Sequence, residues 1–401
     1  MVTFLPSRPG RLADVPSFHR AIGGAESNVA CALARAGHTA RWISRVGTDG
    51  FGDHLVAAIA TSGVDVSHVR RDPHRPTGVY FRTAGDRGTE AHEVAYYRAG
   101  SAASAMSVTT MDLAAIRSGK VLHLSGITAA LSEDCRTLMR ELTKRHVDCH
   151  RHFDCRHHPD RLRRPLVSYD VNYRPGLWRD PQDDARVLLD LARGADLVFV
   201  GEDEAAEAWG VSGGPDAIRA ALPEPGMLVV KRGAAGAVAY DDSGGRHAQP
   251  APRAEVVAAV GAGDAFAAGF LSATLRGLPL HTRIRYGHLW AAAALTVPGD
   301  LATPPSRALA DRLAALDDIA WRGLHLGPGG PDLGSGGPDL GSGPGGPGPP
   351  EQTTTPAEQQ ATDREVHQAL DQHVHQALDQ EVHQAMDREI HQAMNQEVPR
   401  A

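Results

Sequence analysis

Short apolar segments and longer segments with a helical pattern alternate along residues 1–326. The strand-like segments are rich in β-branched residues and lie at residues 40–46, 121–124, 166–171, 197–201 and 227–231. Alanine-rich segments with a helical pattern lie between or after them, at residues 27–36, 53–62, 184–192 and 265–275. Because strands that alternate with helices favour parallel pairing, the pattern predicts an α/β fold with a mainly parallel sheet.

Two short apolar segments fall outside this alternation. Residues 80–82 and 95–98 are rich in aromatic and β-branched side chains and lie between the first helices and the next core strand. Segments this short and this close together favour antiparallel pairing with each other. They predict a small antiparallel excursion from the main sheet.

The composition changes at residue 327. Residues 327–350 are almost entirely Gly, Pro, Ser, Asp and Leu, and residues 329–335 are repeated directly at 336–342. Such a segment cannot bury enough apolar surface to offset its chain entropy. It is typical of a flexible linker.

Residues 351–401 form a tail with an eight-residue repeat. Apolar residues recur at every fourth position from Val366 to Met394, and four helical steps overshoot a full turn by about 40°. The apolar stripe therefore winds around a helix, whereas repeats of seven or eleven residues would hold a supercoil seam. The pattern predicts a polar tail that is disordered or partly helical, with a self-associating helix as the alternative. A metal site shared by its four repeated histidines is disfavoured for the same reason.

Charge separates the tail from the rest of the chain. The 401 residues carry a net charge of −7, but residues 351–401 contain ten acids and three bases and the linker contains two aspartates, which leaves residues 1–326 at +2. A weakly charged unit is unlike a strongly basic nucleic-acid binder. Apolar runs stay shorter than a membrane span, the first residues are unlike a signal peptide, and four cysteines do not form a disulfide framework. We expect a cytoplasmic protein with no membrane or nucleic-acid partner.

The motif with the clearest chemistry is Gly261-Ala262-Gly263-Asp264, which opens a helix of small residues. Its glycines allow a tight turn and a close approach of the backbone to a ligand. The free N–H groups and positive dipole at the start of the helix suit a phosphate. Asp264 is either a helix N-cap or an acid–base group, and the motif alone leaves both open.

Two glycine-rich segments near the N-terminus give this motif a context. Residues 23–28 place Gly23 and Gly24 before a helix that contains Asn28, and residues 45–52 contain three further glycines. With these segments in this order, the chain resembles the PfkB/ribokinase family of carbohydrate kinases over about residues 1–315. The resemblance implies a ribokinase-like three-layer α/β/α sandwich with a small β-sheet lid at residues 1–326. It also implies phosphoryl transfer from ATP to a primary sugar hydroxyl.

Within that family, residues 77–80, 96–102 and 170–178 are most similar to 2-keto-3-deoxygluconate kinases. Their substrate is a sugar acid, and arginine presents a planar fork that binds a carboxylate through two hydrogen bonds. Arg98 and Arg174 lie inside these segments and are candidates for that role, with surface ion pairs as the alternative. A fructokinase-like or ribokinase-like sugar kinase is the alternative function within the family.

The resemblance implies a role for each matched residue. Asp264 would be the general base, and the N–H groups of residues 261–263 would stabilise charge on the transferring phosphoryl group. The cofactors would be ATP and Mg²⁺, with a monovalent cation as an optional third ion, and no side chain is assigned as a direct metal ligand. Residues expected to line the sugar pocket are Gly23, Gly24, Asn28, Tyr80, Tyr96, Arg98 and Arg174. Residues expected at the nucleotide are Lys231, Gly233, Gly236 and Glu204, the last organising Mg²⁺ indirectly.

The chain departs from the family pattern at three places. It opens after the point where family members have a first central strand, and loss of that strand would expose a sheet edge. Ala258 and Gly201 stand where the family usually has an Asp and an Asn, around the metal and the nucleotide, where catalysis depends strongly on charge. The alternative hypothesis is therefore a catalytically impaired kinase-fold protein that binds or scaffolds. Homodimerisation through the lid is the expected assembly.

Residues 144–164 form an insert rich in arginine, histidine and cysteine. An inserted basic surface loop is the favoured interpretation, and a shifted reading frame is a further alternative. A zinc site is also an alternative, although the spacing of Cys149 and Cys155 matches no common zinc pattern. The zinc ligands would come from Cys149, His150, His152, Cys155, His157 and His158.

Overall fold

The computed structural model describes residues 1–83, 93–144, 164–178, 181–297 and 299–327. The tail at 351–401 lies outside the described residues. So do the linker and the insert, apart from residues 144, 164 and 327. Their predicted structures, including the zinc alternative and the helical tail, stay predictions.

A six-stranded sheet forms the centre of the described chain, in the order β12-β11-β10-β9-β8-β7. Strands β7 to β10 are parallel to their neighbours, and β11 and β12 are antiparallel additions at one edge. The four strands predicted within it, from residue 121 to residue 231, are confirmed. The bounds are β7 (Val121–Ser125), β8 (Leu166–Asp170), β9 (Leu197–Gly201), β10 (Met227–Lys231), β11 (Ala237–Tyr240) and β12 (Arg246–Gln249).

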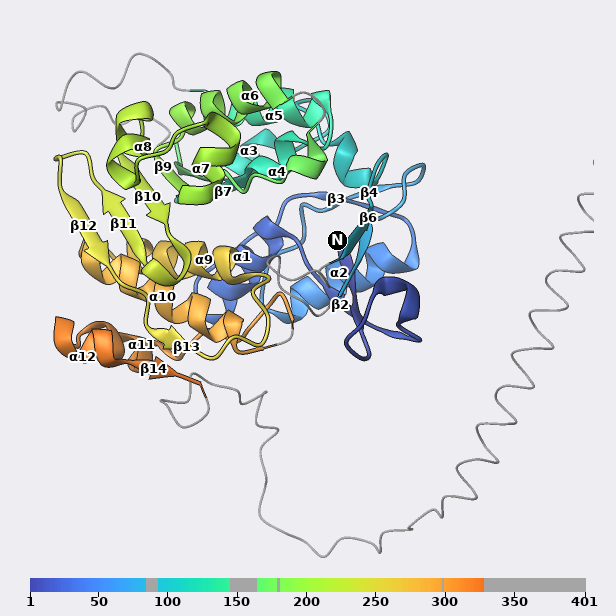
Figure 1. Ribbon diagram of the computed structural model, residues 1–401. Helices are drawn as coiled ribbons and strands as arrows, with labels where there is room; N and C mark the ends of the chain where they lie inside the picture. The colour runs from blue at the N-terminus through green and yellow to red at the C-terminus, as the bar shows by residue number, and fades with distance from the viewer. Residues whose placement is uncertain (84–92, 145–163, 179–180, 298, 328–401) are drawn as a thin grey trace, which may run out of the picture. The chain divides into compact units, whose positions relative to one another are not determined.

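Helices cover both faces of this sheet, as Figure 1 shows. On β9, Val198 and Val200 pack into one apolar cluster while Leu197 and Phe199 pack into the other. Because successive side chains of a strand point to opposite faces, a continuous apolar run predicts burial on both. One layer contains α3 (Leu113–Arg117), α4 (Gly126–Ala129), α5 (Glu133–Thr143), α6 (Pro181–Gly194), α7 (Glu202–Trp209) and α8 (Pro215–Ala221); the other contains α1 (Ala25–Arg35), α9 (Ala262–Leu275), α10 (Leu280–Leu295), α11 (Arg307–Ala314) and α12 (Asp318–Gly323). The three-layer α/β fold is confirmed.

A separate four-stranded sheet forms the lid, in the order β2-β1-β5-β6. β5 and β6 are antiparallel, as the sequence predicts, and β1 joins them by pairing in parallel with β5. The first residues of the chain therefore belong to the lid. The bounds are β1 (Val2–Pro6), β2 (Phe18–Ile22), β5 (Val79–Arg82) and β6 (Val94–Tyr97).

The prediction of a core strand at residues 40–46 is wrong. Only β3 (Arg45–Gly47) is a strand there, and it pairs with β4 (Arg70–Asp72) in a sheet of its own. Residues 40–44 instead bond to Asp65, through the Trp42 amide and the Ala40 carbonyl. The apolar pattern predicted an extended conformation correctly, but a strand also needs a neighbouring edge, and pattern alone does not say which edge is available.

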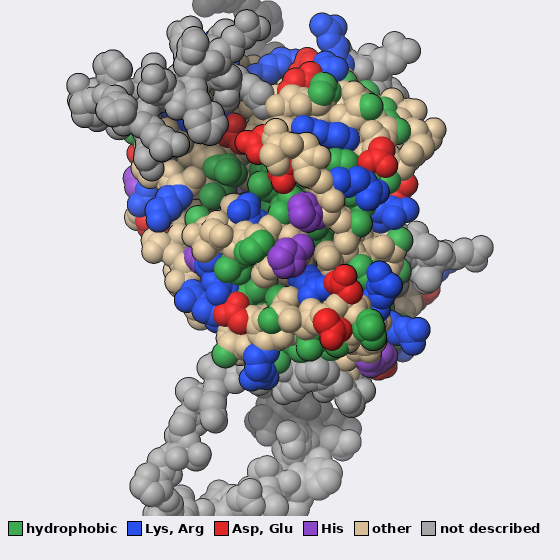
Figure 2. All heavy atoms as spheres, turned by 90° about the vertical axis from the view of Figure 1, so that its left-hand side faces the viewer, with side chains coloured by type: hydrophobic (Ala, Val, Ile, Leu, Met, Phe, Trp, Pro, Cys, Tyr) green, Lys and Arg blue, Asp and Glu red, His purple; other side chains and the backbone are tan. Residues whose placement is uncertain are grey.

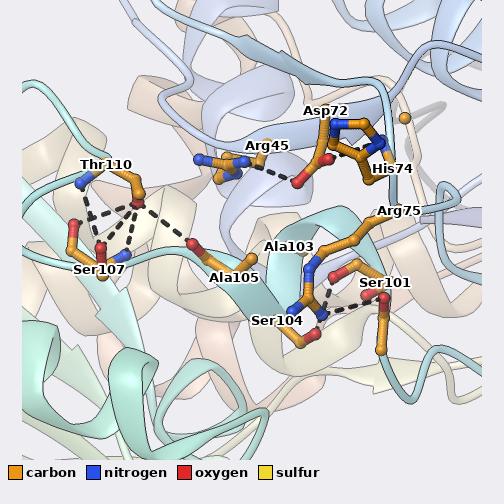
Figure 3. A network of polar contacts seen from close by, with 12 residues as sticks. Arg45, Asp72, His74, Arg75, Ser101, Ala103, Ser104, Ala105, Ser107 and Thr110 are labelled. Carbon is orange, nitrogen blue, oxygen red and sulfur yellow. Dashed lines mark hydrogen bonds and ion pairs between the residues drawn. The ribbon is translucent and has the colours of Figure 1, made fainter.

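Side-chain bonds link β3 to β4 and connect the loop after β4 to the segment that follows the lid (Figure 3). Arg45 forms an ion pair with Asp72 at 2.6 Å, and Asp72 also accepts from the His74 amide at 3.0 Å. Arg75 donates to the Gly100 carbonyl at 3.4 Å. In addition, α2 (Gly50–Thr61) packs against β1 and β3.

Two short strands, β13 (Arg253–Ala254) and β14 (His325–Leu326), pair in parallel at the end of the described chain. Figure 2 shows the face of the molecule that lies on the left of Figure 1, where β12 forms the sheet edge; basic and acidic side chains alternate across it. None of the helices in the described ranges is long and apolar enough to span a membrane.

Candidate active site

A cavity of about 1220 Å³ lies at the carboxyl ends of the parallel strands. Asp170 ends β8, Gly201 ends β9 and Lys231 ends β10, and all three line this cavity. The first turn of α9 reaches it from one helix layer. In open α/β sheets this edge is where ligands usually bind, so the topology itself selects the cavity as the candidate site.

Most of the residues predicted for the site line this one cavity. Three do not: Gly23, Ala262 and Gly236. At Gly236, a Cβ atom would lie 2.1 Å from the Gln249 carbonyl oxygen, so close packing against β12 explains that glycine. Predicted residues that line the cavity are Gly24, Asn28, Tyr80, Tyr96, Arg98, Arg174, Glu204, Lys231, Gly233, Gly261, Gly263 and Asp264.

Asp264 lies in the first turn of α9, and its carboxylate faces the cavity. Asn28 of α1 donates its side-chain N–H to Asp264 Oδ2 at 2.9 Å. Burial raises the pKa of Asp264 to about 7; the Asn28 bond opposes this shift, and the nearby Asp170 charge adds to it. A carboxyl group that titrates near neutrality can exchange a proton at physiological pH.

Asn28 has spare hydrogen-bonding capacity in this site. Its side chain is buried, and its Oδ1 atom accepts no hydrogen bond from the described residues. Leaving a buried acceptor unsatisfied costs about 1–3 kcal/mol. A ligand hydroxyl placed beside Asp264 would satisfy it.

Lys231 and Asp170 form an ion pair below the first turn of α9. The Lys231 ammonium donates to both carboxylate oxygens of Asp170, at 2.9 and 3.1 Å. A Cβ atom on Gly263 would lie 3.7 Å from the same nitrogen. A positive charge therefore stands next to the glycine turn, and although burial favours the neutral amine, Asp170 and Glu204 raise the pKa of Lys231 overall.

Arg98 is a buried cation that lines the cavity. Its guanidinium lies 4.4 Å from the ring centre of Tyr96, and its Nε atom is buried without a hydrogen-bond partner. No carboxylate among the described residues lies within ion-pair distance of it. Burial lowers the pKa of Arg98, an effect that the more distant Glu26 opposes.

Arg174 and Glu204 meet on the wall of the cavity. Arg174 Nη1 lies 3.4 Å from Glu204 Oε1, and the other oxygen of Glu204 accepts from the Gly201 amide at 2.7 Å. Glu204 thus caps α7 as well as pairing with Arg174. The same Nη1 atom donates to the Tyr173 carbonyl at 2.8 Å, so the other donors of the planar Arg174 fork can serve a ligand in the cavity.

Tyr80 is already bonded within the protein. Its hydroxyl donates to Asp300, and its ring packs 5.5 Å from that of Tyr96. Asp300 also pairs with Arg82 of β5, at 3.0 Å. The sequence predicted Tyr80 as a sugar-pocket residue, and the structure adds that its polar atom faces Asp300.

Two acids that bond to predicted site residues were not themselves predicted, Asp170 and Asp300. Asp170 had a usable signal, because it ends a buried strand and begins a segment matched to the family. Asp300 had none, since it lies in a loop after α10 and reaches its partners Tyr80 and Arg82 more than 200 positions earlier in the chain.

The sequence pattern of the pfkB family carbohydrate kinases matches residues 2–307. The chain belongs to the pfkB family of carbohydrate kinases. This pfkB kinase is 32% identical over 310 residues to a 2-dehydro-3-deoxygluconokinase from Bacillus subtilis, an alignment that covers 77% of the chain and 90% of the relative. A 2-dehydro-3-deoxygluconokinase from Thermoproteus tenax is 33% identical over 308 residues, covering 76% and 89%.

The likeness extends to other sugar kinases. A probable fructokinase-6 from Arabidopsis thaliana is 30% identical over 308 residues, covering 74% of the chain and 75% of the relative. Among solved structures, a PfkB protein from Polaromonas sp. JS666 superposes with a TM-score of 0.63 and 33% identity, covering 78% and 96%. The chain is thus a sugar kinase, and the relatives differ in the sugar they are named for.

The departures from the pfkB pattern have structural counterparts. Ala258 is buried, and its amide donates to the Leu295 carbonyl at 3.2 Å. At Gly201, a Cβ atom would lie 2.4 Å from the side-chain oxygen of the exposed Asp203, a flexible neighbour that can move. The described residues hold no group of three or more acids, histidines or cysteines that could bind a metal by themselves.

The kinase cavity continues beyond the predicted site as an apolar groove. The groove runs between residues 40–44 and β7, and β7 is the edge strand of the main sheet. Arg41 and Ser118 close its far end with a 3.2 Å hydrogen bond. Its apolar lining includes Trp42, Ile43, Met106, Met111, Ile116, Leu122, Leu138 and Met139.

Proposed function

We propose that this kinase transfers the γ-phosphoryl group of ATP to the primary hydroxyl of a sugar acid, with 2-keto-3-deoxygluconate (also called 2-dehydro-3-deoxygluconate) as the substrate and its 6-phosphate as the product. The observation that carries the substrate class is Arg98, a buried guanidinium with no carboxylate partner in the described part of the chain. A neutral sugar leaves that charge uncompensated, whereas a carboxylate pairs with it.

The position of Arg98 supports this assignment. Tyr96 stacks under the guanidinium and fixes its plane, so its fork stays oriented towards the cavity. Glu26 acts on Arg98 at longer range, and burial raises the pKa of Glu26 and favours its neutral form. Arg174 supplies a second guanidinium on the cavity wall. We assign Arg98 as the main carboxylate ligand and Arg174 as the supporting one.

Asp264 is assigned as the general base. As the hydroxyl oxygen of the sugar forms a bond to the γ-phosphorus, the bond from that phosphorus to the leaving ADP oxygen breaks, and the hydroxyl proton passes to the Asp264 carboxylate. The pKa of about 7 suits this role, since about half of the Asp264 groups are ionised at pH 7 and the carboxylate is still basic enough to accept the proton. Asn28 orients the carboxylate, and its unsatisfied oxygen accepts from the substrate hydroxyl or a neighbouring one.

The turn at residues 261–263 is assigned as the anion hole. Gly261 adopts a left-handed φ of 82° and starts α9, so the free N–H groups of the first helical turn point out of the helix end. These groups and the helix dipole stabilise the charge on the equatorial phosphoryl oxygens. Lys231 stands beside the turn and adds a full positive charge there.

Mg²⁺ fits this site as an ion carried by the nucleotide. Both oxygens of Asp170 and of Glu204 already bond to protein groups, so the chain offers no complete cage. Mg²⁺ usually keeps several waters and binds one or two carboxylates plus substrate phosphates. Asp170 and Glu204 would hold the hydrated ion, and its chemistry would be the neutralisation of phosphate charge. Position 258 is an alanine, so it offers no carboxylate that could bind a monovalent cation.

A sugar panel tests the proposal. ADP release is measured with 2-keto-3-deoxygluconate, fructose and ribose, in the wild type and in Arg98→Met. We expect a clear preference for the sugar acid, and a loss of about 10- to 100-fold in kcat/KM for it in Arg98→Met, because a hydrogen bond to a charged group contributes about 1.5–3 kcal/mol. Turnover of fructose with equal efficiency, unaffected by Arg98→Met, would instead identify a fructokinase.

Two control variants accompany the panel. Arg283→Met removes a half-buried arginine in the first turn of α10, whose pKa is also lowered by burial, and we expect it to retain the sugar-acid preference. Asp264→Asn should abolish turnover while sugar binding persists. Soluble, folded wild-type protein that releases no ADP with any sugar would support the alternative of a catalytically impaired binding protein.

A further inference from the structure

Asp300 is a buried acid of the cavity wall to which the proposed chemistry gives no role. It follows α10, and its two oxygens are bonded to two residues of one lid strand. Tyr80 donates its hydroxyl to Asp300 Oδ2, and Arg82 Nη2 lies 3.0 Å from Oδ1. The side chains of Arg82 and Asp300 are 2% and 4% exposed, so this is a desolvated ion pair, which is strongly destabilised when one partner is removed.

The backbone of Asp300 touches the glycine turn of α9. A Cβ atom on Gly261 would lie 2.2 Å from the Asp300 carbonyl oxygen and 2.9 Å from its carbonyl carbon. Gly261 therefore has two reasons to be glycine, its left-handed φ of 82° and this contact. The residue that anchors the lid through its side chain thus packs against the anion hole through its backbone.

A second glycine completes the junction. A Cβ atom on Gly23 would lie 2.1 Å from the Tyr80 hydroxyl and 2.8 Å from Asp300 Oδ2. Gly23 does not line the cavity, so the family signature at this position reflects close packing on the Tyr80–Asp300 bond. Three segments, before α1, in β5 and at the start of α9, meet at one residue, Asp300.

We propose that Asp300 is a positioning residue that couples the sugar lid to the anion hole. A continuous series of contacts supports this: Arg98 lies on Tyr96, Tyr96 packs against Tyr80, Tyr80 bonds to Asp300, and Asp300 packs against Gly261. Burial and the Asp300 charge raise the pKa of Tyr80, so the phenol stays protonated and remains the donor. When the carboxylate of a sugar acid fixes Arg98, this series fixes the turn that receives the phosphoryl group. The coupling rests on the proposed function only for the identity of the ligand at Arg98.

The test compares Asp300→Asn with a matched variant, Asp72→Asn. Both replace a buried aspartate paired with an arginine, but the Asp72–Arg45 pair lies in the β3–β4 sheet (Figure 3). With 2-keto-3-deoxygluconate, we expect Asp300→Asn to lower kcat and raise the sugar KM together, for a loss of about 10-fold or more in kcat/KM, while the KM for ATP stays unchanged. Asp72→Asn should change neither kinetic constant.

Hydrogen exchange of the full-length protein without ligand provides an independent readout. We expect Asp300→Asn to speed amide exchange both in β5 and at residues 258–264, and Asp72→Asn to speed it only around β3 and β4. The hydrogen-exchange experiment tests the coupling even if the wild type does not phosphorylate 2-keto-3-deoxygluconate. That result would contradict the proposed substrate and leave the coupling to be decided by hydrogen exchange. Tyr80→Phe, which leaves the Asp300–Arg82 pair intact, serves if Asp300→Asn does not fold, with the same expected pattern and smaller changes.

Two results would overturn the coupling. One is faster exchange confined to β5 with residues 258–264 unchanged. The other is a lower melting temperature with both kcat and the sugar KM unchanged, which is what a purely structural ion pair would give.

Discussion

The protonation state of Asp264 depends on four side chains that come from three different parts of the chain. Asn28, Lys231 and Arg174 favour its ionised form, while burial and Asp170 oppose it. The net result is a pKa of about 7, about three units above an ordinary aspartate. This balance makes the activity of the kinase sensitive to pH in the physiological range.

We expect kcat/KM to rise with pH and to level off above about 7, because only the ionised Asp264 can accept the hydroxyl proton. Lys231, Arg174 and Asp170 are the other charged groups that act on Asp264. In Asn28→Ala the midpoint should move to higher pH, since the bond that favours the carboxylate is lost. Initial rates across the neutral pH range measure this, and a midpoint that stays in place in Asn28→Ala would contradict the assignment.

The same group predicts how stability changes with pH. Its pKa is raised on folding, so the folded state binds more protons than the unfolded state between about pH 4 and 7, and the contribution of Asp264 to stability is lost as pH rises through that window. Asp264→Asn removes this dependence. We expect the variant to gain stability relative to the wild type, by more at pH 8 than at pH 5.

Urea unfolding of both proteins at the two pH values measures this difference. Asp241→Asn serves as the control, at an exposed turn where hydrogen bonds lower the pKa of the acid. Its effect on stability should be the same at pH 5 and pH 8, because this acid is ionised at both pH values in the folded and in the unfolded state. An equal difference between wild type and Asp264→Asn at pH 5 and pH 8 would rule out the raised pKa.

Among single residues, the sequence predicted those whose neighbours in the chain form a recognisable motif. Asp264 follows two glycines at a helix start, and Arg98 and Arg174 lie in matched segments, so all three could be found from neighbouring residues. The bonds that join the site residues to one another could not be found in this way. The Asp264–Asn28 and Asp300–Tyr80 bonds join residues more than 200 positions apart, and only the fold determines which acids end up beside which donors.

Among the elements, α9 has the most direct connection to function. Its first turn carries both the base and the anion hole, and its body packs against α1 and α10. Movement of this helix would displace both groups together. The glycine that begins it is therefore the position where a small substitution should have a large effect.

We expect Gly261→Ala to reduce both kcat and stability. The left-handed φ of 82° costs a non-glycine residue about 1–2 kcal/mol, and the new methyl group would also press against the Asp300 carbonyl, 2.2 Å away. Gly277→Ala, at the other end of α9, is the matched control, because its φ is 69° and a Cβ atom there would have no neighbour within 4 Å. Gly277→Ala should cost about 1 kcal/mol and keep kcat. Equal effects of the two substitutions on kcat would show that the Asp300 contact is unimportant.

Most elements were predictable because they are buried on both faces or carry a clear helical pattern. The strands from β7 to β10 are mainly apolar, and the β5–β6 pair follows from two short apolar runs close in sequence. Residues 40–46 were not predictable in the same way. Their extended, apolar character is present, but the partner they bond to, Asp65, is a single polar residue in a loop, which leaves no periodic signal.

In the whole molecule, the sheets divide between two parts of the chain. The lid and the β3–β4 pair use strands from residues 2–97 alone, and the main sheet and the β13–β14 pair use strands from residues 121–326 alone. No sheet among the described residues joins the two parts. They meet instead where α1 packs on α9 and where side-chain bonds cross between them, among them Asn28–Asp264 and Thr128–Glu26. The apolar groove beside β7 lies between the two parts.

We expect the two parts to open at different free energies. Native-state hydrogen exchange in low concentrations of urea should show β1, β3 and β5 opening before β8, β9 and β10, because the former lie in small sheets at the groove and the latter are buried strands of a six-stranded sheet. Exchange of all six strands at one common free energy would show that the molecule unfolds as a single unit.

Because the cavity and its groove beside β7 lie between the two parts of the chain, substrate binding adds to the stability of the folded protein. A sugar acid that contacts Arg98 in one part and Asp264 in the other binds only when both are folded and in place. At a concentration about 100 times its Kd, such a ligand adds about 2.7 kcal/mol to the stability of that arrangement. An enzyme supplied with sugar acid would thus resist proteolysis in its first hundred residues, while the empty enzyme would be cleaved there first, and its lifetime would follow the supply of its own substrate.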